Sequence, residues 1–299
     1  MRPRKINGAS FQKAGKIGAI LEFASLLENL NTIYSRDTWQ RAIPPMKKPY
    51  LRTSDLAKAV GIHPNTVRLY EAWGFLPKAE RSPAGYRRFT GYDLDQLRLV
   101  RLIFEGGWPG HAVRKTGLAI IQCGATGDLG GALELAHQMV AQVQAERAQA
   151  EAAAAYLERW AAGAPADVTG RALRIGDAAR LLNTTVDAIR NWERNGLLDV
   201  PRDPANGYRL YGAPEIGRLR VIRMLLRAGY SMMAILRMLT ALDDGQTENL
   251  RQSLDTPRAD EDVFMVNDRW LSALAEMERQ AQETIAQIEA MLQRHGELL

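Results

Sequence analysis

Residues that could carry out catalysis or hold a metal are sparse in this 299-residue chain. Its one cysteine, Cys123, can form neither an intramolecular disulfide nor a zinc site made of cysteines. The four histidines lack the spacing of metal ligands and are His63, His111, His137 and His295. The sequence contains no glycine-rich phosphate loop and no nucleophile paired with a base. We therefore predict no catalytic residue, no metal site, no cofactor and no enzymatic activity, with Cys123 as a buried structural thiol.

Arginines beside aromatic residues offer a different chemistry, which is contact with phosphate. Residues 47–108 contain 11 Lys/Arg and 6 Asp/Glu, and residues 173–230 contain 10 and 6. Residues 243–299 contain 5 Lys/Arg and 13 Asp/Glu, so this part of the chain is acidic. Two basic segments predict a polyanionic partner, and the acidic segment is expected to stay away from it.

The two basic segments are copies of one sequence unit. A shift of 122 residues aligns Leu51–Trp108 with Leu173–Tyr230 without a gap, and 15 of the 58 pairs are identical. The identical pairs include Asp55/Asp177, Arg68/Arg190, Glu71/Glu193, Gly74/Gly196, Arg101/Arg223 and the trio Gly85-Tyr86-Arg87/Gly207-Tyr208-Arg209.

Each copy predicts two short helices, a hairpin and two further helices. In the first copy Thr53 or Ser54 is expected to cap a helix over Asp55–Val60, and a second helix is expected to run from Pro64 to Trp73 before Gly74. The corresponding helices of the second copy are Asp177–Leu182 and Val186–Asn195, with Thr185 as a cap and Gly196 after the second. The turns around Gly85 and Gly207 predict two-stranded hairpins. The later helices are expected near Asp93 or Glu215 and near Pro109 or Ser231.

These strings resemble the MerR family of winged helix-turn-helix transcription regulators. The resemblance rests on residues 67–76 (VRLYEAWGFL) with 85–89 (GYRRF), and on 189–198 (IRNWERNGLL) with 207–211 (GYRLY). It occurs twice in the same order at one spacing. The second copy departs from the family pattern at Asn191, and at Asn183, where the family usually has glycine. The resemblance implies a mainly α fold with two winged helix-turn-helix domains, each followed by a long coiled-coil-type helix.

The resemblance also implies which residues meet DNA. The second helix of each unit is expected in the major groove, with Asn65 and Thr66, or Thr185 and Asp187, near base edges. Asp187 is expected either to accept from a cytosine amino group or only to cap its helix. The candidates for phosphate contact are Arg68, Arg87, Arg190, Arg209, Tyr86 and Tyr208. Pairing of Arg68 and Arg190 with a nearby carboxylate is the structural alternative for those two residues.

Other residues in the same motifs are expected to be structural. We expect Tyr70 and Trp192 to be core aromatic residues. We expect Glu71 and Glu193 to hold an arginine of the hairpin or of the third helix.

Two long helices are predicted from apolar residues spaced alternately three and four apart. One seam runs through Leu133, Ala136, Val140, Val143, Arg147, Ala150, Ala154 and Leu157, and the other through Leu271, Leu274, Glu278, Ala281, Ile285, Ile288 and Leu292. An antiparallel register that places Leu133 opposite Leu292 also places Arg147 opposite Glu278. This match predicts an intrachain pseudo-dimer through the long helices. A homodimer with mixed pairing between two chains satisfies the same register, and exposure of both charges to solvent is the structural alternative.

The chain divides into seven segments. They are an N-terminal extension (1–46), a first domain (47–127), a first long helix (128–163), a linker (164–172), a second domain (173–242), a connector (243–262) and a second long helix (263–299). Because Met46-Lys47-Lys48 directly precedes the first repeat, residues 1–45 are expected to be a loosely packed extension or translated upstream sequence. Trp108, Trp160 and Trp270 are expected to pack between domain and long helix rather than to line an effector pocket.

The predicted function is that of a sequence-specific regulator that binds double-stranded promoter DNA and deforms it with two unlike domains. RNA polymerase would be an indirect partner, and the sequence names no small-molecule effector. With no run of about 18 apolar residues and a single cysteine, no membrane span and a cytoplasmic location are expected. The alternative function is a DNA architectural or recombination accessory protein similar to excisionases.

Overall fold

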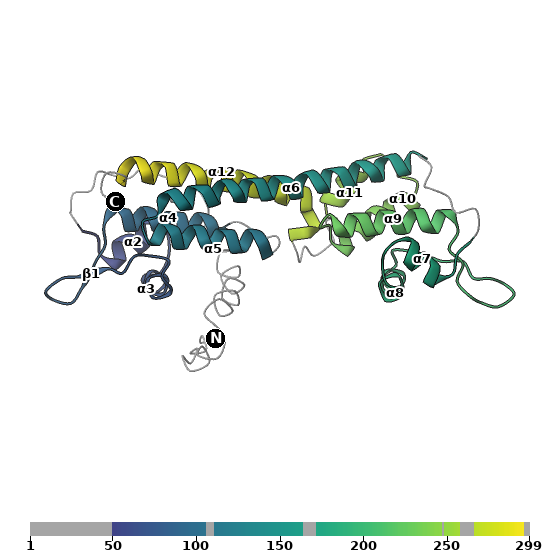
Figure 1. Cartoon of the computed structure of the whole chain (residues 1–299), viewed down its shortest axis with the longest axis horizontal. Coiled ribbons are helices and arrows are strands. Elements are labelled where there is room, and N and C mark those ends of the chain that lie inside the picture. The colour runs from purple at the N-terminus through teal and green to yellow at the C-terminus, as the bar shows by residue number, and fades with distance from the viewer. Residues whose placement is uncertain (1–49, 106–110, 164–171, 247, 258–265, 296–299) are drawn as a thin grey trace, which may run out of the picture. The chain divides into compact units, whose positions relative to one another are not determined.

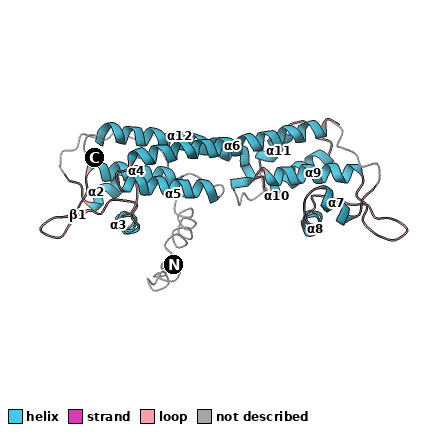
Figure 2. Ribbon diagram, viewed as in Figure 1, coloured by secondary structure: helices cyan, strands magenta, loops and turns pink. Residues whose placement is uncertain are grey.

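The computed structural model describes residues 50–105, 111–163, 172–246, 248–257 and 266–295. The predicted extension 1–46 lies outside this range, as do residues 164–171 of the predicted linker and Trp108. The described residues are mainly helical, which confirms the predicted fold class (Figure 2). No described helix is both long enough and apolar enough to span a membrane.

The chain forms two compact units, and each contains one helix-turn-helix. The first unit comprises the described parts of 1–106, 117–135 and 283–299, and the second those of 107–116 and 136–282 (Figure 1). Two long helices, α6 (Leu129–Ala161) and α12 (Trp270–His295), each contribute one segment to each unit. Every unit is therefore built from pieces that are distant in sequence.

The first helix-turn-helix consists of α2 (Thr53–Ala59) and α3 (Pro64–Trp73). Pro64 suits the first position of α3, where His63 Nδ1 accepts the Asn65 N–H at 3.1 Å, and Gly74 ends the helix at φ 77°. The prediction that Thr53 or Ser54 caps the preceding helix is wrong. The cap is Arg52, whose N–H donates to the Asp55 carboxylate at 2.9 Å, so α2 begins two residues earlier.

The second helix-turn-helix consists of α7 (Ile175–Leu181) and α8 (Val186–Arg194). Thr185 caps α8 as predicted, because its Oγ1 accepts the Ala188 N–H at 3.0 Å. The turn before α8 contains Asn183 at φ 45°, whereas the first copy has Gly61 at φ 67°. Asparagine tolerates this left-handed conformation better than most residues, so the departure from glycine preserves the turn.

A hairpin, called the wing below, follows each helix-turn-helix. In the first unit β1 (Glu80–Arg81) pairs antiparallel with β2 (Arg87–Arg88), and Arg81 lies opposite Arg87. In the second unit the predicted strands are reduced to an isolated bridge between Arg202 and Arg209, while the bridge between Leu173 and Tyr211 matches one between Leu51 and Phe89 in the first unit. Pro201 and Pro204 flank Arg202, and proline has no N–H to donate to a strand ladder.

Each helix-turn-helix, its wing and the helices that follow are called a head below; two further helices follow in the first head and three in the second. They are α4 (Gly91–Glu105) and α5 (His111–Ala125), of which residues 111–116 belong to the second unit, then α9 (Ala213–Arg227), α10 (Met232–Asp243) and α11 (Leu250–Asp255). Tyr70 is fully buried against Phe75 and Phe104, with ring centroids 5.9 Å away in both cases. Trp192 is also buried, so the expectation that both are core aromatic residues is confirmed.

The second long helix begins later than predicted. Residues Val266–Arg269 form a 3₁₀ turn, η4, and α12 starts at Trp270 rather than near 263. The turn is anchored because the Ser231 hydroxyl bonds Asp268 at 2.5 Å and Trp270 Nε1 donates to the Ala228 carbonyl at 2.7 Å. These contacts to the second head are not local in sequence, so helical periodicity alone could not place the start.

The buried face of α12 is wider than the predicted seam. Leu274, Ala281 and Ile288 are buried as expected, but Leu271, Ile285 and Leu292 are only half-buried. The neighbouring positions Trp270, Met277, Thr284 and Met291 are buried as well. A stripe of this width is typical of a helix that packs on more than one neighbour.

Candidate nucleic-acid interface

The start of the second helix in each helix-turn-helix carries exposed polar side chains. In α3, Asn65 and Arg68 are exposed and Thr66 is half-buried. At the start of α8, the cap Thr185 and the helical residues Asp187 and Arg190 are exposed. The predicted base-reading residues of each unit therefore lie together on one open helical turn.

Within each of these turns the arginine is held by the residue three positions earlier. Arg68 Nη1 donates to Asn65 Oδ1 at 2.7 Å, and Arg190 Nη1 lies 3.4 Å from Asp187 Oδ1. The Arg190 pair is exposed and is a weak contact. Pairing with a carboxylate, raised above as the structural alternative, thus applies to Arg190 but not to Arg68, whose partner is an amide.

The tips of both wings present tyrosines to solvent. Tyr86 is 74% exposed and Tyr208 is 59% exposed. Each follows a glycine with positive φ, 81° at Gly85 and 72° at Gly207, a conformation that only glycine adopts at little cost. The phenol of an exposed tyrosine is free to turn its hydroxyl towards a partner's phosphate.

Glu71 on α3 and Glu193 on α8 connect the second helix of each helix-turn-helix, called the recognition helix below, to its wing. Arg87 Nε lies 2.5 Å from Glu71 Oε2, and Arg209 Nε lies 2.7 Å from Glu193 Oε1. The expectation that each glutamate holds an arginine of the wing or of the third helix is confirmed, and the arginine is that of the wing. Glu193 also raises the pKa of Arg209, so this guanidinium stays charged. An arginine has five N–H donors, so one bond through Nε leaves the other donors able to meet a phosphate. Phosphate contact by Arg87 and Arg209 stays a prediction.

Two arginines that sequence analysis did not single out complete a basic cavity in the second unit. Arg174 and Arg202 line a cavity of about 480 Å³ together with Arg190, Tyr208 and Arg209. The Arg174 guanidinium lies 5.0 Å from the centre of the Tyr208 ring, and Arg202 Nη1 donates to the Gly207 carbonyl at 3.1 Å. The repeat alignment contained a signal, because Arg52/Arg174 is an identical pair. A cavity walled by arginines suits a phosphate group.

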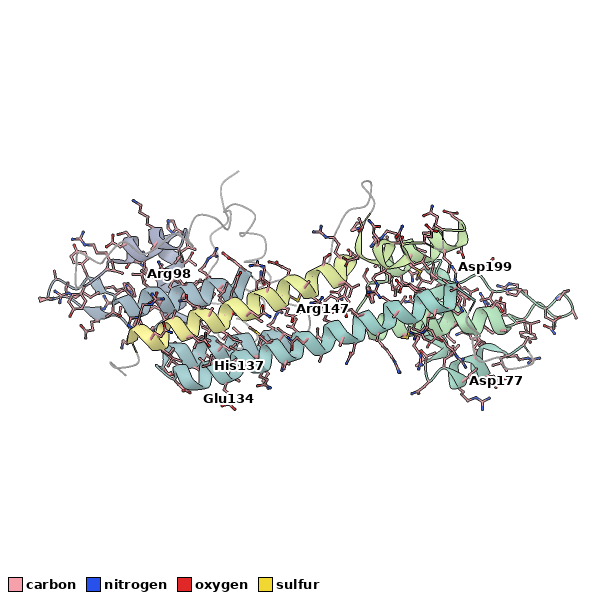
Figure 3. The ribbon with its side chains drawn as sticks, turned by 90° about the horizontal axis from the view of Figure 1, so that it is seen from above. Arg98, Glu134, His137, Arg147, Asp177 and Asp199 are labelled. Carbon is pink, nitrogen blue, oxygen red and sulfur yellow. The ribbon has the colours of Figure 1, made fainter. Side chains whose placement is uncertain are left out.

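The structure brings Arg147 and Glu278 together between α6 and α12 within the second unit. Arg147 Nη1 lies 2.8 Å from Glu278 Oε2, and Gln144 Nε2 donates to the other Glu278 oxygen at 2.8 Å. Figure 3 shows Arg147 on α6 where that helix runs beside α12. Hydrogen bonds from Gln144 and Arg147 lower the pKa of Glu278, and Arg147 is also bonded to Glu151 at 3.0 Å.

Each head packs against the long helix that follows the other head in sequence. In the first unit Asp95 of α4, 2% exposed, accepts hydrogen bonds from Arg294 at 2.9 Å and pairs with His295 at 3.0 Å. In the second unit the Tyr230 hydroxyl donates to the Ala150 carbonyl of α6 at 3.1 Å. Within each unit, a head thus packs on a long helix that lies in the other half of the sequence.

Cys123 is half-buried rather than buried as predicted. Burial and the nearby Asp128 raise the pKa of its thiol, which disfavours the thiolate form that soft metals bind. Across the described residues there is no group of three or more His, Cys, Asp or Glu side chains placed to hold a metal ion.

Both helix-turn-helix segments are similar to family models of MerR-type regulators. Residues 52–89 match the family model described as MerR family regulatory protein, and residues 173–242 match the MerR HTH family regulatory protein model. No solved structure gives a significant match to the chain.

Curated relatives are similar to part of the chain. A mercuric resistance operon regulatory protein of Serratia marcescens is 37% identical over 73 residues, which are 24% of this chain and 50% of that protein. The HTH-type transcriptional regulator CueR of Escherichia coli O157:H7 is 29% identical over 111 residues, 37% of this chain and 72% of CueR. A probable heavy metal-dependent transcriptional regulator of Haemophilus influenzae is 32% identical over 80 residues, which are 27% of this chain and 62% of that protein. The match thus spans half the length of the first of these relatives.

Proposed function

We propose that this chain, whose two helix-turn-helix segments match MerR-family models, is a transcription regulator that binds promoter DNA through two non-identical heads and deforms it. The observation that carries the proposal is the duplicated surface. Each unit places an exposed polar turn at the start of its recognition helix beside a wing held by a Glu–Arg pair. A duplicated site of this kind suits a duplex with two half-sites.

The two heads differ where base edges would be read. The 122-residue shift matches Asn65 with Asp187, and Thr66 with Ala188. An amide both donates and accepts, which suits adenine, whereas a carboxylate only accepts, which suits the cytosine amino group. We therefore expect an operator whose half-sites are not copies of each other.

Closure within one chain supports the same expectation. The Arg147–Glu278 pair connects α6 with α12, and Asp95 holds the C-terminal end of α12 against the first head. A chain closed in this way presents one copy of each head, so one molecule would occupy one asymmetric operator. Two heads tethered in one molecule also gain effective concentration without additional contacts. With both half-sites gripped, bending or untwisting of the intervening DNA would bring promoter elements into register for the polymerase.

The proposal does not include metal sensing. The names of the relatives refer to mercury and heavy metals, but here Cys123 is the one cysteine and its thiol pKa is raised. A thiolate site would need ligands that this donor set does not supply.

The test is selection of bound duplexes from random DNA by the full-length protein, followed by footprinting at two salt concentrations. We expect an asymmetric site of about 20–30 base pairs, bound by one chain, with affinity that falls steeply as salt rises. A circular-permutation mobility assay on that site is expected to show a bend. Selection of a palindrome bound by two chains would contradict the unlike-heads proposal.

Single variants assign the heads. Arg68→Ala is expected to weaken protection of one half-site first, and Arg190→Ala that of the other. Arg279→Ala, which removes one positive charge from α12 outside both heads, serves as the matched control and is expected to leave both unchanged. Equal loss at both half-sites from either head variant would show that the heads do not read separate sequences.

A further inference from the structure

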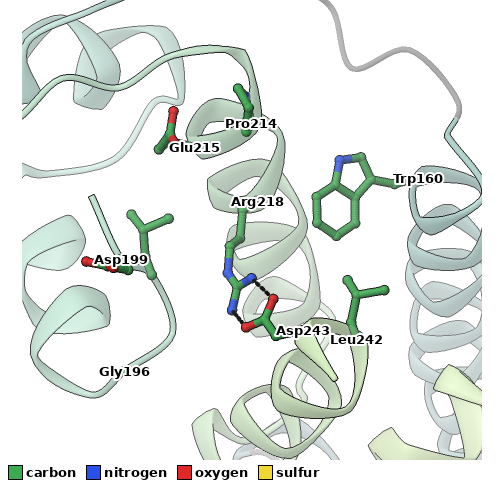
Figure 4. A pocket seen from close by; sticks show the side chains of 9 residues that line it. Trp160, Gly196, Asp199, Pro214, Glu215, Arg218, Leu242 and Asp243 are labelled. Carbon is green, nitrogen blue, oxygen red and sulfur yellow. Dashed lines mark hydrogen bonds and ion pairs between the residues drawn. The ribbon is translucent and has the colours of Figure 1, made fainter. Parts of the chain in front are cut away.

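The second unit contains another cavity of about 480 Å³, which shares no lining residue with the basic wing cavity. It lies between the end of α6, the first half of α9 and the end of α10 (Figure 4). Trp160 from α6 and Leu242 from α10 form its apolar wall, joined by Leu198. Trp160 was expected only to pack between head and long helix, yet it also borders this space.

An arginine–carboxylate pair forms the polar side of the cavity. Arg218 Nη1 and Nη2 lie 2.6 Å and 2.7 Å from the two oxygens of Asp243, and Arg218 Nε donates to the Leu197 carbonyl at 2.8 Å. The Arg218 charge is therefore matched by Asp243, and the pKa of Asp243 is lowered by this pairing. Two more carboxylates, Asp199 and Glu215, line the same cavity. Its walls thus carry three acids against one base, which favours a cationic occupant over an anionic one.

The first unit shows what occupies the matching neighbourhood there. Gln96 stands 122 residues before Arg218 and makes the equivalent bond, from Nε2 to the Phe75 carbonyl at 3.0 Å. Tyr92 stands 122 residues before Pro214, which lines the cavity, and its ring packs edge-on against His295 at 5.4 Å. One turn along α4, Asp95 accepts from Arg294 and His295. In the first unit the Arg294 guanidinium and the His295 imidazole therefore lie beside the Asp95 carboxylate, and the imidazole also lies against the Tyr92 ring.

We propose that the cavity bordered by Trp160 and the Arg218–Asp243 pair binds an organic cation with a flat apolar body. The Trp160 indole borders the cavity, and cations are attracted to the face of an aromatic ring. The Asp199 and Glu215 carboxylates balance the ligand's charge, and Leu198 and Leu242 cover its apolar part. An anionic ligand would have to displace Asp243 from Arg218 and face the remaining acids.

Three ligands of nearly equal shape and different charge test the site in the absence of DNA. They are 2-naphthamidine, which is cationic, 2-naphthamide, which is neutral, and 2-naphthoate, which is anionic. Titration calorimetry with the full-length protein is expected to show the cation binding at least tenfold more tightly than the anion, with the amide between them. Equal binding of all three, or a preference for the anion, would overturn the proposal.

Substitutions then locate the binding. Trp160→Ala is expected to weaken binding of 2-naphthamidine about tenfold, and Trp160→Phe less, because phenylalanine keeps an aromatic face. Asp199→Asn is expected to weaken it a few-fold, whereas Asp177→Asn, an exposed acid of α7 in the same unit, is the matched control. Thermal melting of each variant separates loss of the site from loss of the fold. A folded Trp160→Ala protein with unchanged affinity would place the cation elsewhere and contradict the proposal.

The position of the cavity also predicts regulation, and this step rests on the proposed DNA-binding function. Arg218 connects the cavity to Leu197, in the turn that directly follows α8. We expect saturating 2-naphthamidine to change the protection of the half-site bound by the second head, which Arg190→Ala weakens, and to leave protection of the other half-site unchanged. Ligand binding without any change in protection would remove the regulatory step and leave the cation site standing. Absence of DNA binding by the unliganded and the liganded protein would instead count against the proposed function.

Discussion

The two heads of this chain share one sequence unit, but they differ in the charged side chains that pair on α4 of the first head and on α9 of the second. In the first head the carboxylate of Asp95 is buried on α4 and is paired by the C-terminal end of α12. The residue that matches it in the second head is Gly217, and there α9 instead uses Arg218, which pairs with the exposed Asp243. The first head has therefore been closed by the chain's own basic side chains, whereas the second has kept an open acidic cavity. The exposed polar turn and the Glu–Arg pair of the wing recur in both heads, whereas the surroundings of α4 and α9 differ.

Removal of the buried carboxylate is expected to give the largest effect. Asp95→Asn would leave the Arg294, Arg98 and His295 contacts without their charged partner. Loss of one member of a buried pair typically costs about 3–5 kcal/mol, and since Arg294 is 40% exposed we expect about 2–3 kcal/mol here. Urea unfolding of full-length Asp95→Asn against wild type measures this. The control is Asp177→Asn, which alters an exposed ion pair of the second head and is expected to change the free energy of unfolding by less than about 1 kcal/mol. Similar losses from both variants would show that the C-terminal end of α12 contributes little to the first head.

A smaller effect, confined to recognition, is expected when the second head is given the first head's side chain. Asp187→Asn replaces an acceptor-only group by one that also donates, so the preferred base at one position of its half-site is expected to change. A well-placed base contact gives about 1–3 kcal/mol of discrimination, which corresponds to a clear shift in selected sequences. Selection from random DNA with wild type and Asp187→Asn checks this. An unchanged consensus would mean that Asp187 only holds Arg190 and does not read a base.

Local features of both heads could be predicted from the sequence, but the contacts that each head makes with distant parts of the chain could not. Pro64, Thr185 and Gly74 determine helix ends through contacts within a few residues, so their roles follow from type and position. The Glu–Arg pairs of the wings could also be predicted, because the same glutamate and arginine recur in both copies of the repeat. The Asp95–Arg294 contact joins residues 199 positions apart, and nothing in the pattern of either helix marks it. The start of α12 was missed for the same reason, since it depends on Ser231 and Ala228 of the second head.

The glycines that end the two recognition helices test whether the heads share backbone geometry. Gly74 and Gly196 have φ of 77° and 75°, and a side chain in this left-handed region costs about 1–2 kcal/mol. Gly74→Ala and Gly196→Ala are expected to lower the free energy of unfolding by similar amounts. The new methyl group meets nothing within 4 Å at Gly74, and at Gly196 it meets Leu236 Cδ1 at an ordinary 3.6 Å. Chemical denaturation of both variants is the measurement. A cost in one head alone would mean that the other can relax its turn.

The smallest effect is expected at the ion pair between the long helices, because Arg147 is 42% exposed. Glu278→Gln is expected to cost about 0.5–1 kcal/mol near neutral pH, with Glu151→Gln, which alters Arg147's other partner, costing less. The pKa of Glu278 is lowered in the folded state from its ordinary 4.5. Its carboxylate therefore stabilises the fold above about pH 4.5, and this contribution is lost as the pH falls through the lowered value. Thermal melting of wild type and Glu278→Gln is thus expected to converge as the pH is reduced.

The charge exchange Arg147→Glu with Glu278→Arg completes this test. If the pair acts directly, the double variant melts above both single variants, because each single change places like charges together. Single variants no less stable than the double would show that the two charges do not interact. Because the Arg147–Glu278 contact lies within one chain, the result is also expected to be independent of protein concentration. Concentration-dependent melting would indicate pairing between chains, and the two unlike heads would then occur twice in each assembly.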